Sequence, residues 1–275
     1  MPLRFAYNTN GVANHRFEDA LSLIADSGYD GVALTLDHHH FDPFAPELAK
    51  RADQLAAQLN RLGLGLVIET GARYLLDPRR KHEPTLVSPE AEGRRLRVEF
   101  LARAVQIAQA CNGEAVSFWA GVPSAEVSGE AASSYLRDGL AMLLDRISPD
   151  STVSLALEPE PGMLVETVDD YVAWKQQFGR LSLALDTGHC LVSNDRDPVQ
   201  AVREFAPDLG TVTVEDMRRG VHDHLPFGEG DMNIPAVLRA LREVNFERLV
   251  CVELSRDSHR AHTMVPQALA YLKRA

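Results

Sequence analysis

The chain has 275 residues, of which 45% are hydrophobic and 24% are charged, as is typical of a soluble globular protein with a large core. No apolar stretch approaches the roughly 18 residues that a membrane span needs, and the N-terminus lacks the apolar run of a signal peptide. We therefore expect a cytoplasmic protein without a membrane partner. A formal net charge of -11 disfavours a nucleic-acid partner, because affinity for DNA depends on Lys and Arg that displace counterions, and favours a small polar molecule.

Short apolar segments alternate with helical patterns along the whole chain. Strands are expected at 3–7, 31–36, 65–69, 115–118, 153–158, 181–186, 210–215 and 249–253. Helices are expected at 17–27, 46–62, 90–110, 125–146, 167–178, 198–205, 234–244 and 259–273. The segment 74–89 is a long polar loop, either a lid or an ordinary excursion. About eight strand and helix units without a linker predict a single (β/α)8 TIM barrel domain over 1–275, close to the roughly 250 residues typical of that fold.

Carboxylates end several of the later strands. Glu158, Asp186 and Glu253 each stand at the end of a short apolar run. Because side chains alternate along a strand, Glu158 shares one face with the small residues Ser154 and Ala156. If these faces point into the barrel, the carboxylates converge at its C-terminal mouth, where barrel enzymes place their chemistry. Like charges gathered there repel one another, so we expect a divalent metal held by oxygen and imidazole ligands.

Four short motifs stand at or just after these strand ends: Glu-Pro at 158–159, Asp-Thr-Gly-His at 186–189, His-Asp-His-Leu-Pro-Phe-Gly-Glu-Gly at 222–230 and Val-Glu-Leu-Ser at 252–255. In this order they resemble the motifs of the xylose isomerase-like barrel superfamily. The superfamily includes sugar-phosphate isomerases, tagatose-type ketose epimerases and the endonuclease IV class of apurinic endonucleases. The resemblance runs along the whole chain and implies a metal-dependent isomerase or epimerase that acts on a small sugar, polyol or hydroxy-carbonyl compound through an enediolate.

Two other functions remain open on the same scaffold. One is a metal-dependent hydrolase or lyase, including an endonuclease IV-like enzyme, and the other is a barrel that binds a metabolite without turning it over. Glu69 and Trp119 end strands where the trinuclear endonucleases have histidines, which argues against the additional zinc ligands of that class.

The resemblance implies one divalent ion, of Mn, Zn, Mg or Co, held by Glu158, Asp186, Glu253 and a histidine. Many sugar isomerases carry this histidine on the seventh strand, where the present chain has Thr213. We expect His224, in the loop just beyond, to replace it, because imidazole is the commonest neutral metal donor. The resemblance also implies that Glu158 and Glu253 carry out the proton transfers, from opposite faces of the substrate. Each carboxylate could instead cap a helix, stabilise a turn or form a salt bridge.

Five further residues are expected to contact the substrate: His189, His222, Glu215, Arg256 and Trp119. The residue that matches His189 touches substrate in ketose epimerases and binds metal in the multi-zinc endonucleases. Glu215 is a candidate base or metal ligand, or an ion-pair partner of a following arginine, and His222 is a candidate ligand or a solvated loop residue. Trp119 would form an apolar wall over a sugar ring, or simply pack.

Other polar residues of the expected mouth carry weaker signals. The run His38, His39, His40 can point at most one or two side chains inward, since neighbouring side chains diverge. Arginines in the mouth loops could bind a phosphate or carboxylate or neutralise the acidic mouth; they are Arg73, Arg218, Arg219 and Arg256. Three single cysteines form neither a disulfide framework nor a zinc motif. A homo-oligomer is possible.

Overall fold

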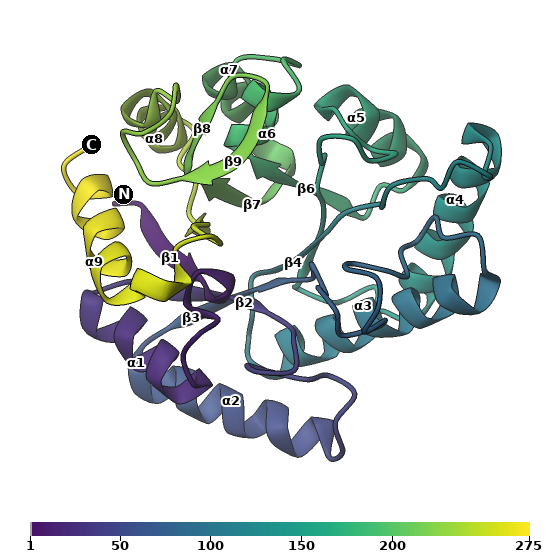
Figure 1. Cartoon of the computed structure of the whole chain (residues 1–275), viewed down its shortest axis with the longest axis horizontal. Coiled ribbons are helices and arrows are strands. Elements are labelled where there is room, and N and C mark those ends of the chain that lie inside the picture. The colour runs from purple at the N-terminus through teal and green to yellow at the C-terminus, as the bar shows by residue number, and fades with distance from the viewer. Residues whose placement is uncertain (1) are drawn as a thin grey trace.

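The computed structural model describes residues 2–275, and within them eight parallel strands close into a barrel in the order β1-β10-β7-β6-β5-β4-β3-β2 (Figure 1). The barrel strands are β1 (Arg4–Asn8), β2 (Gly31–Thr35), β3 (Gly65–Glu69), β4 (Ala115–Phe118), β5 (Ser154–Leu157), β6 (Leu181–Asp186), β7 (Leu209–Val214) and β10 (Leu249–Val252). The predicted TIM barrel is confirmed. Every expected barrel strand is present, with ends that differ from the expected ones by at most one residue.

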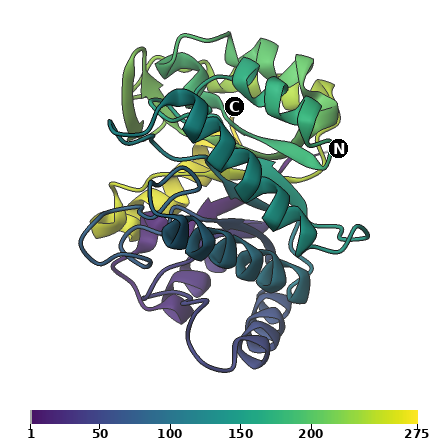
Figure 2. The ribbon, with the colours of Figure 1, turned by 90° about the vertical axis from the view of Figure 1, so that its right-hand side faces the viewer.

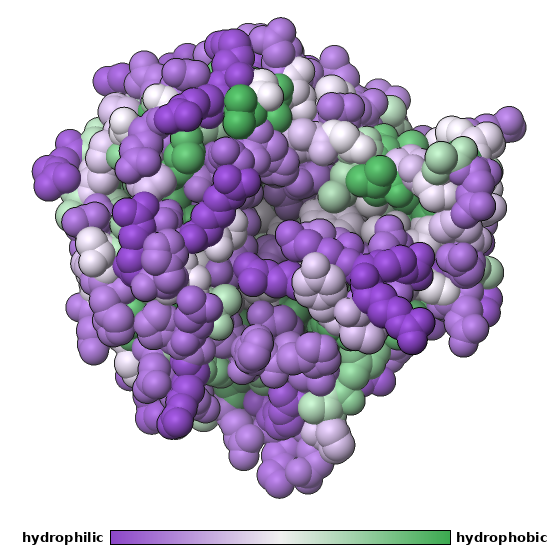
Figure 3. Space-filling view, in the orientation of Figure 1, coloured by the Kyte–Doolittle hydropathy of each residue, from purple (hydrophilic) through white to green (hydrophobic). Residues whose placement is uncertain are grey.

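Helices cover the outside of the barrel, and Figure 2 shows α3 and α4 side by side on that outer layer. The principal helices are α1 (Phe17–Ser27), α2 (Leu48–Leu62), α3 (Ala91–Ala110), α4 (Gly129–Asp145), α5 (Val168–Gln177), α7 (Pro198–Glu204), α8 (Ile234–Glu243) and α9 (Ala261–Leu272). Their apolar faces and the outward side chains of the strands form one large core. Among residues 2–275, no helix combines the length and the hydropathy needed to cross a membrane. The face seen in Figure 3 is predominantly hydrophilic.

Two elements near the mouth differ from the sequence prediction. The Asp-Thr-Gly-His turn opens a short helix, α6 (Thr187–Val192), and the segment expected as a loop after β7 is an antiparallel hairpin of β8 (Asp216–Arg218) and β9 (Val221–Leu225). The hairpin strands are short and polar, so they lack the apolar pattern that marks a buried strand. Asp216 fixes the hairpin because its carboxylate accepts hydrogen bonds from the backbone N–H groups of Gly228, at 2.7 Å, and Met232, at 3.0 Å.

The long loop between β3 and α3 is divided between core and mouth. Leu86 and Val87 are fully buried, and Leu86 packs close to Gly139 of α4. The earlier part of the loop, from Gly71 to His82, lies at the mouth. The loop is therefore anchored at one end and borders the barrel opening at the other.

Small side chains fill much of the barrel interior, where Ala6, Ala33, Ala115 and Cys251 form a buried cluster with Val67 and Leu249. Gly210 lies where β7 bulges against β6, and a Cβ added there would stand 2.8 Å from the Cβ of Ser182 and 3.1 Å from that of Ala156. We expect Gly210→Ala to lower the free energy of unfolding by about 1–3 kcal/mol, because an overpacked site must push its neighbours apart. Urea unfolding measures this, with Gly129→Ala as a matched control whose Cβ meets nothing within 4 Å. Equal stability of the two variants would contradict the prediction.

Candidate active site and metal centre

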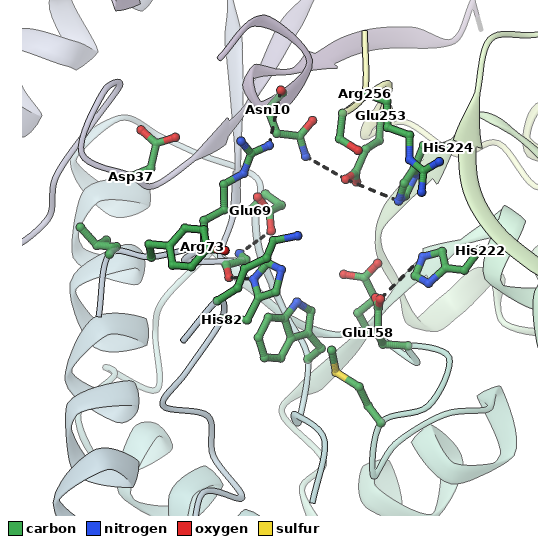
Figure 4. Close-up of a pocket in the computed structure, with 18 of the residues that line it drawn as sticks. Asn10, Asp37, Glu69, Arg73, His82, Glu158, His222, His224, Glu253 and Arg256 are labelled. Atoms are coloured by element: carbon green, nitrogen blue, oxygen red, sulfur yellow. Dashed lines mark hydrogen bonds and ion pairs between the residues drawn. The ribbon is translucent and has the colours of Figure 1, made fainter. Parts of the chain in front are cut away.

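A cavity of about 650 Å³ lies at the C-terminal ends of the barrel strands (Figure 4). Nine residues were predicted to bind metal, to transfer protons or to contact substrate, and seven of them line this cavity: Trp119, Glu158, His189, His222, His224, Glu253 and Arg256. The other two, Asp186 and Glu215, are buried at the ends of β6 and β7. The weaker candidates His38, His39 and Arg73 also line the cavity. The strand ends and the β8–β9 hairpin thus bring residues that are far apart in the sequence to one place.

Asp186 both caps a helix and presents a free oxygen. Its Oδ1 accepts hydrogen bonds from the N–H groups of Gly188, at 2.8 Å, and His189, at 3.1 Å, at the start of α6. Its Oδ2 is buried and has no hydrogen-bond partner among the described residues. Gly188 is required here, because a Cβ would collide with the carboxylate of Glu215. The two interpretations of Asp186, turn stabiliser and metal ligand, are therefore compatible.

His189 is oriented by the backbone. Its Nδ1 lies 3.1 Å from the carbonyl oxygen of Pro159, which can only accept, so Nδ1 carries the hydrogen. In the neutral ring Nε2 then offers a lone pair, 3.1 Å from Nε2 of His222 and 3.6 Å from Oδ2 of Asp186. A backbone carbonyl is one of the usual partners that orient a metal-binding histidine. Burial lowers the pKa of His189, but Asp186 and Glu160 outweigh it and the net shift is upward.

The hairpin supplies two imidazoles from one face. His222 and His224 alternate with Asp223 along β9, and their ring centroids are 5.3 Å apart. Burial lowers the pKa of each to about 4, with a contribution from His189. Both rings are neutral at pH 7 and can donate a lone pair to a metal. His224 is central, because its Nδ1 is 4.0 Å from Oε2 of Glu215 and its Nε2 is 4.0 Å from Oε1 of Glu253.

Burial and mutual repulsion raise the pKa values of the carboxylates around the cavity. Burial, with Glu160 and Asp186 nearby, raises the pKa of Glu158 well above its ordinary value. Burial and Asp186 raise the pKa of Glu253 to about 7, although Nδ2 of Asn10 donates a 2.8 Å hydrogen bond to it. Burial and Asp186 likewise raise the pKa of Glu215. A cation would relieve this repulsion and let the groups ionise.

Unpartnered donor atoms indicate where a cation fits. Oδ2 of Asp186, both carboxylate oxygens of Glu215 and Nδ1 of His224 are buried and, with both carboxylates ionised, lack hydrogen-bond partners within residues 2–275. A protonated Glu215 would instead donate a hydrogen bond to Asp186. One donor atom from each of these three residues lies within 4.8 Å of the others. Buried polar atoms are normally satisfied, so this mixed oxygen and nitrogen set fits a divalent metal.

Two more donor groups adjoin the first. One consists of His189, His222 and His224, and the other consists of Glu158, Glu160 and His189. Within the described residues, no such group unites Glu158, Asp186 and Glu253.

Several residues of the site were absent from the sequence prediction. Glu160 lies 3.6 Å from Nδ1 of His189 and 3.7 Å from Nε2 of His222. It stands two residues after Glu158, so the alternation rule carried past Pro159 would have found it. Asn10 had no sequence signal, because its contact with Glu253 spans 243 positions.

Trp119 and Arg256 each have a partner already. Only 6% of Trp119 is exposed, and the guanidinium of the buried Arg97 lies 4.4 Å from its ring centroid, so an edge of the indole reaches the cavity while the rest packs. Nη2 of Arg256 forms an ion pair of 2.5 Å with Asp223. Thr213 is half-buried, and its carbonyl oxygen accepts a hydrogen bond from Thr187.

Known structures resemble the whole chain. A 3-keto-D-glucoside 4-epimerase from E. coli superposes with a TM-score of 0.77 at 16% identity over 100% of both chains. A probable 3-DHS dehydratase from Bacillus anthracis gives a TM-score of 0.73 at 16% identity over 98% of this chain and 99% of that one. The IOLI protein, whose structure is described with a bound zinc atom, superposes with a TM-score of 0.73 at 18% identity over 99% of this chain and 96% of that one. At these identities the likeness establishes the fold alone.

The sequence itself also matches a family. No curated protein sequence matches this chain significantly. The family model of the xylose isomerase-like TIM barrel matches residues 21–275, which is most of the chain. With the closed eight-stranded barrel, this match shows that the chain belongs to the xylose isomerase-like TIM barrel family.

Proposed function

We propose that the protein is a divalent-metal-dependent sugar isomerase or epimerase, which moves a proton on a small ketose or related hydroxy-carbonyl compound. The observation that carries this proposal is the pair of cavity-lining carboxylates, Glu158 and Glu253, beside the unpartnered donors of Asp186 and His224. A cavity of about 650 Å³ lies within the range of roughly 300–1,000 Å³ that is usual for small-molecule sites. The E. coli epimerase with the same fold supports this class of reaction.

The proposed metal ligands are Glu158, Asp186, His224 and Glu253, as the family resemblance implies. Glu215 is a further candidate, because its two free oxygens adjoin Asp186 and His224. A divalent ion held by these residues would supply the positive charge that polarises a substrate carbonyl and an adjacent hydroxyl. Both the nitrogen and the oxygen donors suit Zn, Mn or Co, and the carboxylates also suit Mg.

Glu158 and Glu253 are the proposed acid and base. They reach the cavity from β5 and β10, which are separated by β6 and β7 in the barrel, so they approach a bound substrate from different sides. One carboxylate removes the proton next to the carbonyl, and the other, which starts in its protonated form, delivers a proton from the other side of the substrate, provided that each keeps one oxygen free. The hydrogen bond from Asn10 orients Glu253. His189, His222 and Arg256 are placed to hold substrate oxygens, with the edge of Trp119 as an apolar wall.

A ketose panel tests the reaction. Metal-loaded protein is incubated with ketohexoses and ketopentoses, and proton NMR follows the appearance of an epimer or of the isomeric aldose. Protein stripped with a chelator is the control. Conversion of one sugar by the metal-loaded protein alone is expected. Conversion at the same rate by the stripped protein would contradict a metal-dependent mechanism, and no conversion of any sugar would favour a binding protein.

The hairpin histidine gives a prediction for metal binding. We expect His224→Ala to weaken metal affinity about tenfold or more, because a lost ligand costs at least as much as a lost supporting group. His39→Ala, in another mouth loop, should change it less. Isothermal titration with the metal measures both. Restoration of metal affinity by Thr213→His in the His224→Ala background would support the exchange of one ligand position for the other. Equal and negligible losses of affinity in His224→Ala and His39→Ala would leave Glu215 as the remaining candidate.

A further inference from the structure

Basic side chains reach the cavity wall mainly from the loop that follows β3, although Asp37 and Glu69 also line the wall on this side and Arg256 lines it after β10. The strands from β5 to β10 contribute the carboxylates described above, whereas the loop that follows β3 brings Arg73, Lys81 and His82 to the wall. Arg73 extends from this loop toward Asn10 and Glu69 (Figure 4). The metal-type donors and this basic segment therefore border the same cavity from different elements.

Arg73 has hydrogen-bonding capacity to spare. Its side chain makes one hydrogen bond, from Nη2 to the backbone oxygen of Asn10, and at 3.5 Å this bond is long. No carboxylate within residues 2–275 forms an ion pair with Arg73 or Lys81, in contrast to Arg256, which is held by its ion pair. A guanidinium carries five N–H donors, so most of those on Arg73 remain available to a ligand.

Arg73 lies near enough to Glu69 and Glu253 to offset part of the rise that burial causes in the pKa of each carboxyl, but it forms an ion pair with neither of them. Glu69 ends β3 close to the loop, and its Oε1 accepts a hydrogen bond from the backbone N–H of Gly71. A guanidinium that served only to balance this carboxylate would be expected to pair with it directly, since the paired geometry is the strong one. Arg73 instead faces the cavity without such a pair.

The backbone of the loop holds Arg73 in a strained conformation. Ala72 and Arg73 have φ values of 58° and 39°, in the left-handed region that residues with a Cβ rarely adopt. The carbonyl of Arg73 accepts a hydrogen bond of 2.5 Å from the N–H of His82, and this bond closes the loop. Below it, the buried Arg97 donates a 2.8 Å hydrogen bond to the carbonyl of Thr70. Strain of this kind persists where surrounding contacts enforce it, and it concentrates at functional sites.

We propose that the substrate of this site is an anionic sugar, and that Arg73, assisted by Lys81, binds its carboxylate or phosphate. The planar guanidinium matches the two oxygens of either group, and the ammonium adds a second charge. The anion would lie toward the loop after β3 and the reacting carbons toward Glu158 and Glu253. This inference rests on the proposed function for the position of the reacting carbons, but anion binding can be measured without turnover.

Calorimetric titration of the metal-loaded protein tests the proposal. The probes are D-fructose, D-fructose 6-phosphate and 5-keto-D-gluconate, which are a neutral, a phosphorylated and a carboxylated ketose. At least one anionic ketose should bind about tenfold or more tightly than D-fructose, the effect of one charge-assisted hydrogen bond. The anion that binds distinguishes phosphate from carboxylate. The preference should shrink as salt is raised.

Three variants locate the anion. Arg73→Gln should reduce the preference to within about twofold, since the charge-assisted bond is lost, and Arg73→Lys should keep part of it because the charge remains. Arg80→Gln is the matched control on the same loop, because Arg80 is paired with Asp77 at 2.8 Å and does not line the cavity. It should bind like the unmodified protein. Circular dichroism and metal content establish that each variant is folded and loaded.

Three outcomes would overturn the proposal. They are equal binding of neutral and anionic ketoses, no binding of any anionic ketose, and an anion preference that persists in Arg73→Gln, as when the metal alone holds the anion. The proposed function fails separately. Anion selectivity that depends on Arg73, without any conversion of the sugar, would refute the isomerase but keep the anion site. Conversion of a neutral ketose at a rate that Arg73→Gln does not change would support the isomerase and refute the anion site.

Discussion

Asp186→Asn is expected to remove most of the divalent metal from the purified protein while leaving the barrel folded. The carboxylate contributes charge and a buried oxygen that has no partner among residues 2–275, and the amide replaces that oxygen with a neutral group. Loss of a group that only supports a metal ligand costs about 10–100-fold in affinity, so loss of a direct ligand should cost about 100-fold or more. Oδ1 already caps α6, and an Asn side chain can still accept those bonds. Elemental analysis and metal titration measure the loss, and Glu158→Gln should show the same direction.

Asp223→Asn is the matched control. Asp223 stands between His222 and His224 on β9, but strand alternation turns it away from them and toward Arg256. The metal content of the Asp223→Asn variant should equal that of the unmodified protein. Full metal retention in both Asp186→Asn and Glu158→Gln would refute the ligand assignment. The number of ions per chain is also informative, since one is predicted and the three adjoining donor groups could hold more.

The barrel could be predicted because its signals are local. Each buried parallel strand is a short apolar run, and each ends near the residue where its pattern ends, as for β3 and β6. The same alternation that makes β5 a strand places Glu158 at the mouth and would also have indicated Glu160. The positions of these carboxylates follow from strand register alone.

The remaining parts of the site depend on tertiary structure. The β8–β9 hairpin has polar strands, so its sequence pattern predicts a loop. Only the folded chain places His222 and His224 against His189. Arg73 was one of several arginines in the sequence. Its left-handed backbone and the ion pair that occupies Arg256 become visible only in the structure, and they change which arginine is the better candidate for an anion.

The hairpin also offers a physical account of Thr213. Thr213 pairs in register with Asp186 on the neighbouring strand, so a histidine there would approach the same donors. The threonine leaves that space, and His224 reaches Glu215 and Glu253 from the hairpin instead. If His224 is the metal ligand, its position is set by the pairing of β8 with β9 and not by the register of the barrel strands.

Glu253→Gln is expected to abolish the exchange of solvent deuterium into the substrate carbon next to the carbonyl. If Glu158 and Glu253 pass a proton through an enediolate, the unmodified protein in D₂O should wash deuterium into that carbon, and proton NMR should show the loss of one signal. An amide cannot accept the proton, so the exchange rate should fall by about 10²–10⁴, the usual contribution of a general acid or base. Excess metal is supplied to keep the site loaded, because Glu253 is also a proposed ligand.

Two controls separate proton transfer from binding. Glu229→Gln changes an exposed carboxylate outside the cavity and should leave the exchange rate unaltered. Arg256→Ala should mainly raise the substrate concentration that gives half of the maximal exchange rate. Full exchange in metal-loaded Glu253→Gln would exclude this glutamate as an essential acid or base. The role would then pass to Glu215, because its unpartnered carboxylate lies within reach of the same histidine, His224, and carries a pKa raised by burial and by Asp186.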